Sequence, residues 1–490
     1  MAAMPSPASR RLLRRGLIAV GAVLLVVGGL VAFVLLHAPG NVSHPGVQFT
    51  PPSATTTASS TTTAARRSGR RPDTFVWPWY GFDAGRTRDF SPAGRLKPPF
   101  HRGWTFDAGA LLEFPPVIWH GTMFMLGDDG VVSAIPTSDG RPLWRRKVGT
   151  LAAASPAVDG ADRLIVLPIL SVHGSLPGGG QFVAISMRTG RILWSHPVPS
   201  GTESSPIIAG HTTYFGDQGG TLHALRLRDG HEFWTYHAGG AIKGGPALAN
   251  GVLYFGDYAG RVHAVRAATG REVWTVGTDG ARFGFGSGQF YATPAVAFGR
   301  VYIGNTDGRV YSFGARTGTL AWATGTGAYV YASAAVTDAP GLGPTVYVGS
   351  YDGYLYAFDA RSGSVRWRHY AGAKISGAAS IIDNVVYYSA LRIRSTVGLD
   401  ATTGRTVFQF GDGDFSAAIA DDHALYVDGY STVVQFLPGR LAPRRHPGPL
   451  RSHQRVTHRP RVAPHRPAHR RTVRRGSRRR WTHRGARARG

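Results

Sequence analysis

The chain has 490 residues and a formal net charge of +27, and it contains no cysteine. The absence of cysteine excludes disulfides, thiolate metal sites, a cysteine nucleophile and a lipid-modified N-terminal cysteine. Residues 1–72 and 440–490 carry eight and eighteen arginines and no acidic residue, whereas residues 73–439 are close to neutral. The basicity therefore belongs to the ends and says little about the folded domain, which we expect over residues 73–439.

The first predicted element is a membrane anchor. A basic N-terminus over residues 1–15 contains four arginines and precedes 21 uncharged residues over 16–36. About 20 apolar residues span a bilayer as a helix, and flanking arginines favour a cytoplasmic N-terminus. A cleaved signal peptide is the alternative, but its apolar stretch is shorter and ends in small residues. We therefore predict a single-pass protein of the cell membrane, with the rest of the chain extracytoplasmic.

A linker is predicted to follow the anchor. Residues 37–72 are rich in Ser, Thr and Pro and contain little apolar bulk. Such a segment cannot bury enough surface to fold, so we expect it to be disordered.

An eleven-residue motif recurs through the body of the chain. It reads AVRAATGREVW at residues 264–274, and a period of 40 to 50 residues separates its copies. The copies end at Trp144, Trp194, Trp234, Trp274, Trp322 and Trp367, with a weaker copy that ends at Phe408. Such a period is typical of propeller blades or helical arrays. Alternating apolar residues and Asp-Gly turns before each motif are typical of β-hairpins, so the pattern predicts an all-β propeller of four-stranded antiparallel blades.

Eight blades are predicted, the last one closed by an N-terminal strand. Trp104 lies 40 residues before Trp144 on a strand with no hairpin before it, while the repeat after Phe408 stops without an outermost strand. Joining these two ends completes a blade and removes an exposed sheet edge. We expect the recurring Trp to lie on the outermost strand and cover the gap to the neighbouring blade, a packing role rather than a stacking platform for a ligand.

The motif A-x-x-x-x-[TS]-G-x-x-x-W resembles the tryptophan-docking motif of the pyrroloquinoline-quinone (PQQ) dehydrogenase propellers. Non-enzymatic relatives carry it too, among them the propeller lipoprotein of the outer-membrane assembly machinery. The stretch WPWYGFDAGRTRDFSP at 77–92 is similar to the segment that opens the dehydrogenases. The resemblance implies a PQQ-like propeller over about 75–437. In the enzymes it also implies quinone, a calcium ion held by carboxylate and amide oxygens, and an Asp base.

No segment of this chain accepts those calcium ligands or that base residue by residue. Asp128, Asp217, Asp257, Asp307 and Asp352 each occupy the same hairpin turn of a different blade. Because Asp commonly caps such turns, we interpret them as structural and predict no metal site. We expect no cofactor, with PQQ and calcium as the alternative.

The candidate site is the mouth of the central channel. The connections between blades and the turns between second and third strands emerge on one face, which also carries two insertions, 167–181 and 277–292. Five residues near the starts of the innermost strands are expected to ring the channel there: Glu113, Glu203, Lys243, Tyr291 and Tyr331. The Glu and Lys on adjacent blades could orient a polar ligand or neutralise each other, and the tyrosines could pack or stack. Neutral drift of the insertion loops is the alternative to a binding surface.

The last predicted element is a disordered basic tail over residues 440–490, rich in Arg, His and Pro. It would bind polyanions through salt-sensitive contacts. Outside the cytoplasm, anionic cell-wall polymers or lipid head groups are the expected partners. Specific recognition of nucleic acid is not expected, since aromatic residues are not interleaved with the basic ones. A tail without a selected role is the remaining alternative.

Together these features predict a membrane-anchored, extracytoplasmic propeller that acts as a binding or scaffolding module of the cell envelope. Its expected partners are envelope proteins held on the insertion-bearing face. We favour a protein that is not an enzyme. A PQQ-dependent dehydrogenase is the alternative, and an extracellular small-ligand sensor is a third hypothesis, disfavoured because the predicted cytoplasmic segment is too short for an output domain.

Overall fold

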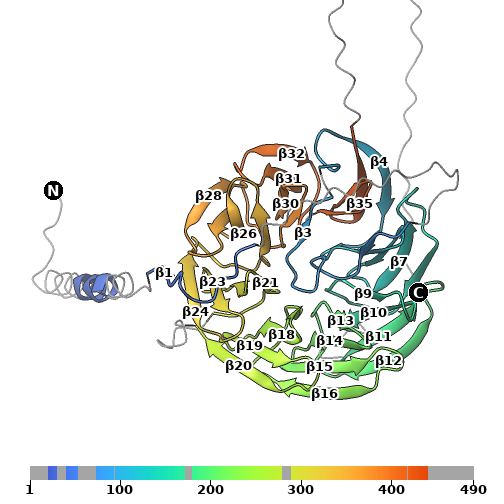
Figure 1. The fold of residues 1–490 in the computed structure, drawn as a ribbon, viewed down its shortest axis with the longest axis horizontal. Coiled ribbons are helices and arrows are strands. Elements are labelled where there is room, and N and C mark those ends of the chain that lie inside the picture. The colour runs from blue at the N-terminus through green and yellow to red at the C-terminus, as the bar shows by residue number, and fades with distance from the viewer. Residues whose placement is uncertain are drawn as a thin grey trace, which may run out of the picture. The chain divides into compact units, whose positions relative to one another are not determined.

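The computed structural model describes residues 20–29, 40–52, 73–92, 94–171, 179–278, 288–416 and 418–439. The chain divides into two units, residues 1–439 and 440–490, and all of the described residues belong to the first. Within these residues, eight sheets follow one another around a common axis (Figure 1), each built on four antiparallel strands and three of them extended by a fifth strand. The predicted eight-bladed propeller is therefore confirmed.

In blades 1 to 7 the strands run in chain order from the axis outward. Blade 1 contains β5 (Val117–Trp119), β6 (Thr122–Leu126), β7 (Val131–Pro136) and β8 (Trp144–Lys147). Blade 2 contains β9 (Ala157–Asp159), β10 (Leu164–Ile169), β11 (Gly180–Ser186) and β12 (Ile192–Val198). Blade 3 contains β13 (Ile207–Ala209), β14 (Thr212–Gly216), β15 (Thr221–Arg226) and β16 (Glu232–His237). Blade 4 contains β17 (Ala247–Ala249), β18 (Val252–Gly256), β19 (Arg261–Arg266) and β20 (Glu272–Gly277).

The second half of the ring repeats this order. Blade 5 contains β21 (Ala295–Ala297), β22 (Arg300–Gly304), β23 (Arg309–Gly314) and β24 (Leu320–Gly325). Blade 6 contains β25 (Ala335–Ala339), β26 (Gly343–Gly349), β27 (Tyr354–Asp359) and β28 (Val365–Tyr370). Blade 7 contains β29 (Ser380–Ile382), β30 (Val385–Ala390), β31 (Ser395–Asp400) and β32 (Thr406–Phe410). Blade 8 contains β33 (Ala418–Ala420), β34 (Leu425–Asp428), β35 (Thr432–Pro438) and β4 (Phe100–Asp107).

The core lies between the blades rather than inside any one of them. The middle strands, such as β18 and β19, are buried on both faces, because each sheet packs between two others. The outermost strands alternate between exposed and partly buried residues, as in β28. Each cluster of buried apolar side chains accordingly draws residues from two neighbouring blades.

Seven tryptophans connect each blade to the next. The indole N–H donates to the backbone carbonyl at the fourth position of the following motif, over 2.7 to 3.1 Å. The pairs are Trp104 with Thr137, Trp144 with Met187, Trp194 with Leu227, Trp234 with Ala267, Trp274 with Ala315, Trp322 with Ala360, and Trp367 with Ala401. A buried or partly buried indole is thus both packed and hydrogen-bonded at each of these seven interfaces.

The glycine of each motif receives the tryptophan of the preceding blade. Gly270 has φ +69°, and a Cβ there would lie 2.7 Å from the Trp234 ring. Glycines 140, 190, 230, 318, 363 and 404 face the preceding tryptophan in the same way. Ala264, by contrast, pairs across strands with Trp274 of its own blade. One motif therefore supplies the Trp for one interface and the Gly for the other.

The ends of the chain close the ring as predicted. Strand β4 pairs antiparallel with β35 to complete blade 8. Gln435 lies at an irregularity in this pairing and donates to the carbonyl of Thr137, the same oxygen that accepts the indole N–H of Trp104. Between blades 7 and 8, Phe408 takes the place of the indole and packs edge-on against Phe436, with ring centroids 5.2 Å apart.

An N-terminal segment lines the inner ends of the blades. Strand β2 (Val76–Trp77) pairs with β5, and β3 (Asp89–Phe90) pairs parallel with β29, so the segment passes near the axis (Figure 1). Between them, backbone amides of five innermost strands donate to its carbonyls over 2.7 to 2.9 Å: Val158 to Pro78, Leu248 to Ala84, Val296 to Gly85, Val336 to Thr87, and Ile381 to Arg88. The segment therefore satisfies inner-strand edges that would otherwise lack partners.

Arg86 fixes this segment to backbone carbonyls just before the innermost strands of blades 3 and 4. Its side chain is fully buried and donates to the carbonyls of Ser205, Pro206 and Pro246 over 3.0 Å each. Burial, together with the charge of Arg88, lowers the pKa of Arg86 to about 9, so it remains a cation at neutral pH.

The predicted anchor is wrong. The described N-terminal helix covers residues 20–29, and none of the helices in the described residues is long and apolar enough to cross a membrane. The single-pass topology over residues 16–36 falls with this finding, and so does the orientation that we derived from it. Within the predicted linker, β1 (Val42–Ser43) pairs with β24 and extends blade 5.

We predict that a methyl group at Gly270 weakens the docking of blade 3 on blade 4. The substitution G270A should lower the free energy of unfolding by about 1–3 kcal/mol more than G251A does, because overpacking adds to backbone strain. Gly251 is the matched control: its φ is +73°, but a Cβ there would meet nothing within 4 Å. Equal losses for the two variants in urea unfolding would show that the contact with Trp234 contributes nothing.

Candidate functional site

A cavity of about 310 Å³ lies on the propeller axis. The five residues predicted to ring the channel mouth all line it: Glu113, Glu203, Lys243, Tyr291 and Tyr331. They come from loops that precede the innermost strands of blades 1, 3, 4, 5 and 6. Since residues of all five loops line one cavity, the loops converge there. The volume is at the small end of the range for sites that hold small molecules.

The charged side chains at the mouth are paired. The Nζ of Lys243 lies 3.0 Å from Oε1 of Glu203, and the same oxygen accepts a hydrogen bond of 2.6 Å from Gln218. Glu113 forms no ion pair among the described residues. Burial, with the nearby charge of Glu203, raises its pKa above the usual range. The mouth therefore combines an ion pair, whose two charges cancel, with one carboxyl group whose raised pKa disfavours the ionised form.

An aromatic wall forms the other side of the cavity mouth. Tyr291 and Tyr331 meet edge-on at 5.5 Å, and Tyr351 packs on Tyr331 at 4.8 Å. Lys243 lies over the rings of Tyr258 and Tyr291, at 5.4 and 6.0 Å from their centroids. We had not predicted Tyr258 or Tyr351. Both sit in turns between second and third strands, which emerge on the face of the mouth, so this topology could have identified them.

The deep end of the cavity is formed by the N-terminal segment. Trp77, Tyr80 and Arg88 line it, and Arg88 lies over the Tyr80 ring at 4.6 Å from the centroid. Arg88 is buried and donates through Nη1 to the carbonyls of Arg86 and Ala334. Its Nε and Nη2 and the indole nitrogen of Trp77 have no hydrogen-bond partner among the described residues. These three donor atoms belong to residues that line the cavity, and the atoms themselves are fully buried.

The family alternative of a quinone with calcium does not fit these residues. Calcium takes six to eight oxygen ligands, which proteins supply largely through carboxylates and amides. Glu113 and Glu203 are the acidic side chains among the described lining residues, which include no Asn or Gln. One of these two carboxylates is already paired with Lys243. We therefore derive no reaction step through that cofactor.

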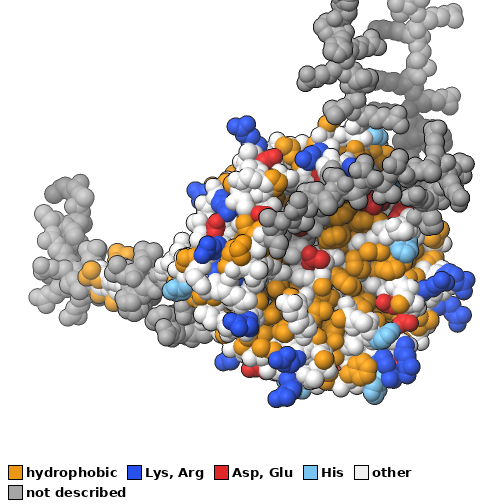
Figure 2. Space-filling view, in the orientation of Figure 1, with side chains coloured by type: hydrophobic (Ala, Val, Ile, Leu, Met, Phe, Trp, Pro, Cys, Tyr) orange, Lys and Arg blue, Asp and Glu red, His pale blue; other side chains and the backbone are white. Residues whose placement is uncertain are grey.

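The Asp residues of the recurring turns behave as turn caps where the structure shows their bonds. Oδ1 of Asp257 accepts a hydrogen bond from the backbone N–H of Arg261 over 2.8 Å, and Asp217 caps Thr221 in the same way. Of the two predicted insertions, residues 172–178 and 279–287 lie outside the described residues, as does the basic tail. Figure 2 shows Lys and Arg mainly at the rim of the propeller.

Sequence comparison assigns the family. A family model described as "Outer membrane protein assembly factor BamB" (PQQ_2) matches residues 101–241, 229–340 and 332–466. These three overlapping matches cover more than half of the chain, and they begin at strand β4 and run through all eight blades. The chain therefore belongs to this family of PQQ-like propellers.

Individual relatives are distant. BamB of Yersinia pestis is 27% identical over 108 residues, which is 22% of this chain and 27% of that protein. The chain thus matches only about a quarter of the length of the curated relatives. Among solved structures, BamB from Moraxella catarrhalis aligns with a TM-score of 0.55 and 19% identity, over 69% of this chain and 100% of that one.

The quinoprotein dehydrogenases share the same fold. The quinohemoprotein alcohol dehydrogenase ADHIIG of Pseudomonas putida HK5 aligns with a TM-score of 0.62 and 14% identity, over 77% of this chain and 82% of that one. At such identities the likeness establishes the fold alone.

We predict that the substitution E113Q stabilises the protein at neutral pH. Because the folded-state pKa of Glu113 is raised, its ionisation opposes folding above the unfolded-state pKa of about 4.3. The gain should therefore be present at pH 7 and disappear as the pH falls to about 4, in thermal melts measured across that range. E113D keeps the charge and serves as the control. A gain in stability for E113Q that does not change with pH would contradict the raised pKa of Glu113.

Proposed function

We propose that this protein is a non-enzymatic binding propeller of the cell envelope that holds a protein partner on its mouth face, the face that carries the connections between blades. One observation supports this most directly. Four large apolar side chains are exposed there on consecutive blades: Tyr329 (55%), Tyr370 (61%), Ile393 (48%) and Tyr430 (39%). Exposed aromatic residues gathered on one face are typical of protein interfaces.

The topology puts these four side chains on the mouth face. Ile393 and Tyr430 lie in or next to turns between second and third strands, in blades 7 and 8. Tyr329 lies in the connection between blades 5 and 6, and Tyr370 ends the outermost strand of blade 6. Tyr370 packs on Tyr354 at 5.0 Å, and Arg394 covers the Tyr430 ring at 4.7 Å. Because these contacts already restrict the Tyr370 and Tyr430 rings, a partner that binds them causes only a small further loss of side-chain entropy.

The family supports a partner in the envelope. The curated relatives are named outer membrane protein assembly factors, and by analogy we propose that this propeller also serves the handling of envelope proteins. The paired charges of Glu203 and Lys243 suit a scaffold better than a site that must ionise a substrate. Polyanion binding by residues 440–490 stays a prediction.

A photo-crosslinking amino acid tests the proposed interface. Placed at position 329 or 370 of the full chain in its native cells, it should give an adduct with an envelope protein, identified by mass spectrometry. The control is position 143, where Leu143 is 64% exposed but precedes an outermost strand at the opposite end of blade 1. The substitution Y430A should lower the yield from position 370 about fivefold, as the loss of an interface anchor does.

The same adducts from position 143, or no adduct with any envelope protein from 329 and 370, would overturn the proposal.

A second candidate function is the recognition of a small anionic ligand in the cavity. It is favoured by the free Nε and Nη2 of Arg88 and the free indole N–H of Trp77, all buried at the deep end. Arginine binds carboxylates through two parallel hydrogen bonds, and no carboxylate side chain takes these donors among the described residues. A ligand that carries a carboxylate group would fit this arrangement.

Calorimetric titration of the full chain with PQQ and with citrate, each with and without calcium, tests this candidate. We expect R88K to lower the affinity at least about tenfold, because lysine keeps the charge but loses the planar pair of donors. The basic tail is the same in both proteins, so only the difference between them reports on the cavity. Equal heats of binding for wild type and R88K would exclude recognition of an anionic ligand in the cavity. Calcium-dependent binding of PQQ would support the dehydrogenase instead.

A further inference from the structure

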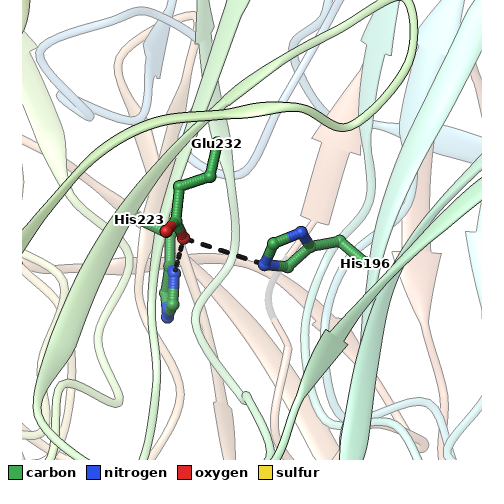
Figure 3. Close-up of side chains that lie close together, drawn as sticks. All are labelled: His196, His223 and Glu232. Carbon is green, nitrogen blue, oxygen red and sulfur yellow. Dashed lines mark hydrogen bonds and ion pairs between the residues drawn. The ribbon is translucent and has the colours of Figure 1, made fainter.

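Three potential metal ligands converge between blades 2 and 3, away from the axis (Figure 3). His196 comes from β12, the outermost strand of blade 2, while His223 and Glu232 come from β15 and β16 of blade 3. Oε2 of Glu232 lies 2.9 Å from Nδ1 of His223 and 3.7 Å from Nε2 of His196. One ligand atom of each residue lies within 4.8 Å of the other two. Two imidazoles and a carboxylate therefore point toward one another.

The spacing suits a tetrahedral transition metal. With metal–nitrogen and metal–oxygen distances of about 2.0–2.2 Å, tetrahedral ligand atoms lie about 3.3 Å apart. The separation of 3.7 Å between His196 and Glu232 is long for a hydrogen bond but close to this value. Only small side-chain movements would bring the three ligands to one ion.

His223 is oriented as metal-binding histidines are. Its Nε2 lies 3.3 Å from Oδ2 of Asp217, which leaves Nδ1 toward the cluster. Asp217 is itself held by the Ser200 hydroxyl and the backbone N–H of Thr221. The imidazole stacks on Phe215 with centroids 4.9 Å apart. A carboxylate on the far nitrogen fixes the ring and makes the near nitrogen a better ligand.

The next pair of blades supplies an internal comparison. Forty residues further along, Asp257, His263 and Glu272 repeat Asp217, His223 and Glu232, and His263 stacks on Phe255 in the same way. There, however, Tyr236 stands where blade 2 has His196. Its hydroxyl forms a hydrogen bond of 3.0 Å with Nδ1 of His263 and donates one of 2.6 Å to Glu272. The three side chains therefore satisfy one another through hydrogen bonds.

The two rings at this position lie alike. His196 meets His223 at a centroid distance of 6.0 Å and 67°, and Tyr236 meets His263 at 5.6 Å and 70°. The same backbone frame thus carries a closed hydrogen-bond network in one case and three convergent ligand atoms in the other.

We propose that His196, His223 and Glu232 bind one divalent transition metal ion, of the zinc class, which links blades 2 and 3. Two histidines and a glutamate are a ligand set that zinc accepts, with a fourth position left for water or an incoming side chain. The carboxylate is the most exposed of the three, at 37% of its side chain, so the fourth position opens to solvent. By linkage, the ion stabilises the folded propeller.

A proton is the competing occupant. Burial opposes a charge on His223, but its hydrogen bonds to Asp217 and Glu232 outweigh burial and raise its pKa. A protonated His223 could bridge the two carboxylates without any metal. The experiment must therefore distinguish an ion from a proton.

The test measures zinc binding by the full chain, freed of metal with EDTA and purified without a histidine tag. Two variants exploit the repeat: H196Y copies blade 3 into blade 2, and Y236H copies blade 2 into blade 3. Both introduce a side chain that the chain already accommodates at the equivalent position. Histidines of the tail are the same in all three proteins, so differences in stoichiometry report on the blades alone.

We expect wild type to bind one zinc equivalent more than H196Y, and Y236H to bind one more than wild type. Cobalt(II) should give a four-coordinate absorption spectrum in wild type that H196Y lacks, and zinc should raise the melting temperature of wild type more than that of H196Y. Equal stoichiometry and equal melting shifts in wild type and H196Y would overturn the proposal and leave the proton as the occupant. H196Y that remains folded without zinc keeps this comparison valid.

Discussion

The fold depends on the docking of an indole from one blade onto the glycine turn of the next, which recurs at seven of the eight interfaces. A single four-stranded sheet of this kind has two apolar faces and cannot bury either of them alone. The hydrogen bond from the indole N–H to a backbone carbonyl, as from Trp234 to Ala267, fixes the distance and tilt between neighbours. Because the ring closes through β4 and β35, every such interface constrains all the others. Closure also pairs the edge of β35, which would otherwise be open.

The second constraint is the N-terminal segment at the axis. The short innermost strands leave amide groups facing the centre of the ring, and the carbonyls of the segment accept hydrogen bonds from five of these strands. Arg86 does the reverse and donates to carbonyls of the loops. The cavity is therefore built from two parts of the chain that are far apart in sequence, mouth loops above and residues 77–88 below. Its chemistry follows from that meeting: paired charges at the mouth and buried donors at the bottom.

The repeat also allows one side-chain exchange to alter local chemistry. Blades 3 and 4 hold a Tyr–His–Glu network, whereas blades 2 and 3 hold two histidines and a glutamate on the same frame. Since the backbone and the orienting Asp are common to both, the exchange of Tyr for His is the difference that matters. A scaffold whose stability is spread over many equivalent interfaces can tolerate such local specialisation.

The sequence by itself determined the fold, the number of blades and the five residues at the channel mouth. These follow from period, turn chemistry and strand alternation, which are local properties repeated often enough to be unambiguous. The membrane anchor predicted from hydropathy was wrong, since none of the helices in the described residues is long and apolar enough to cross a membrane. Tertiary structure alone decided the rest. Arg88 reaches the cavity because the N-terminal segment crosses the axis, and His196 meets Glu232 because consecutive blades pack face to face. Neither distance can be read from a local pattern of residues.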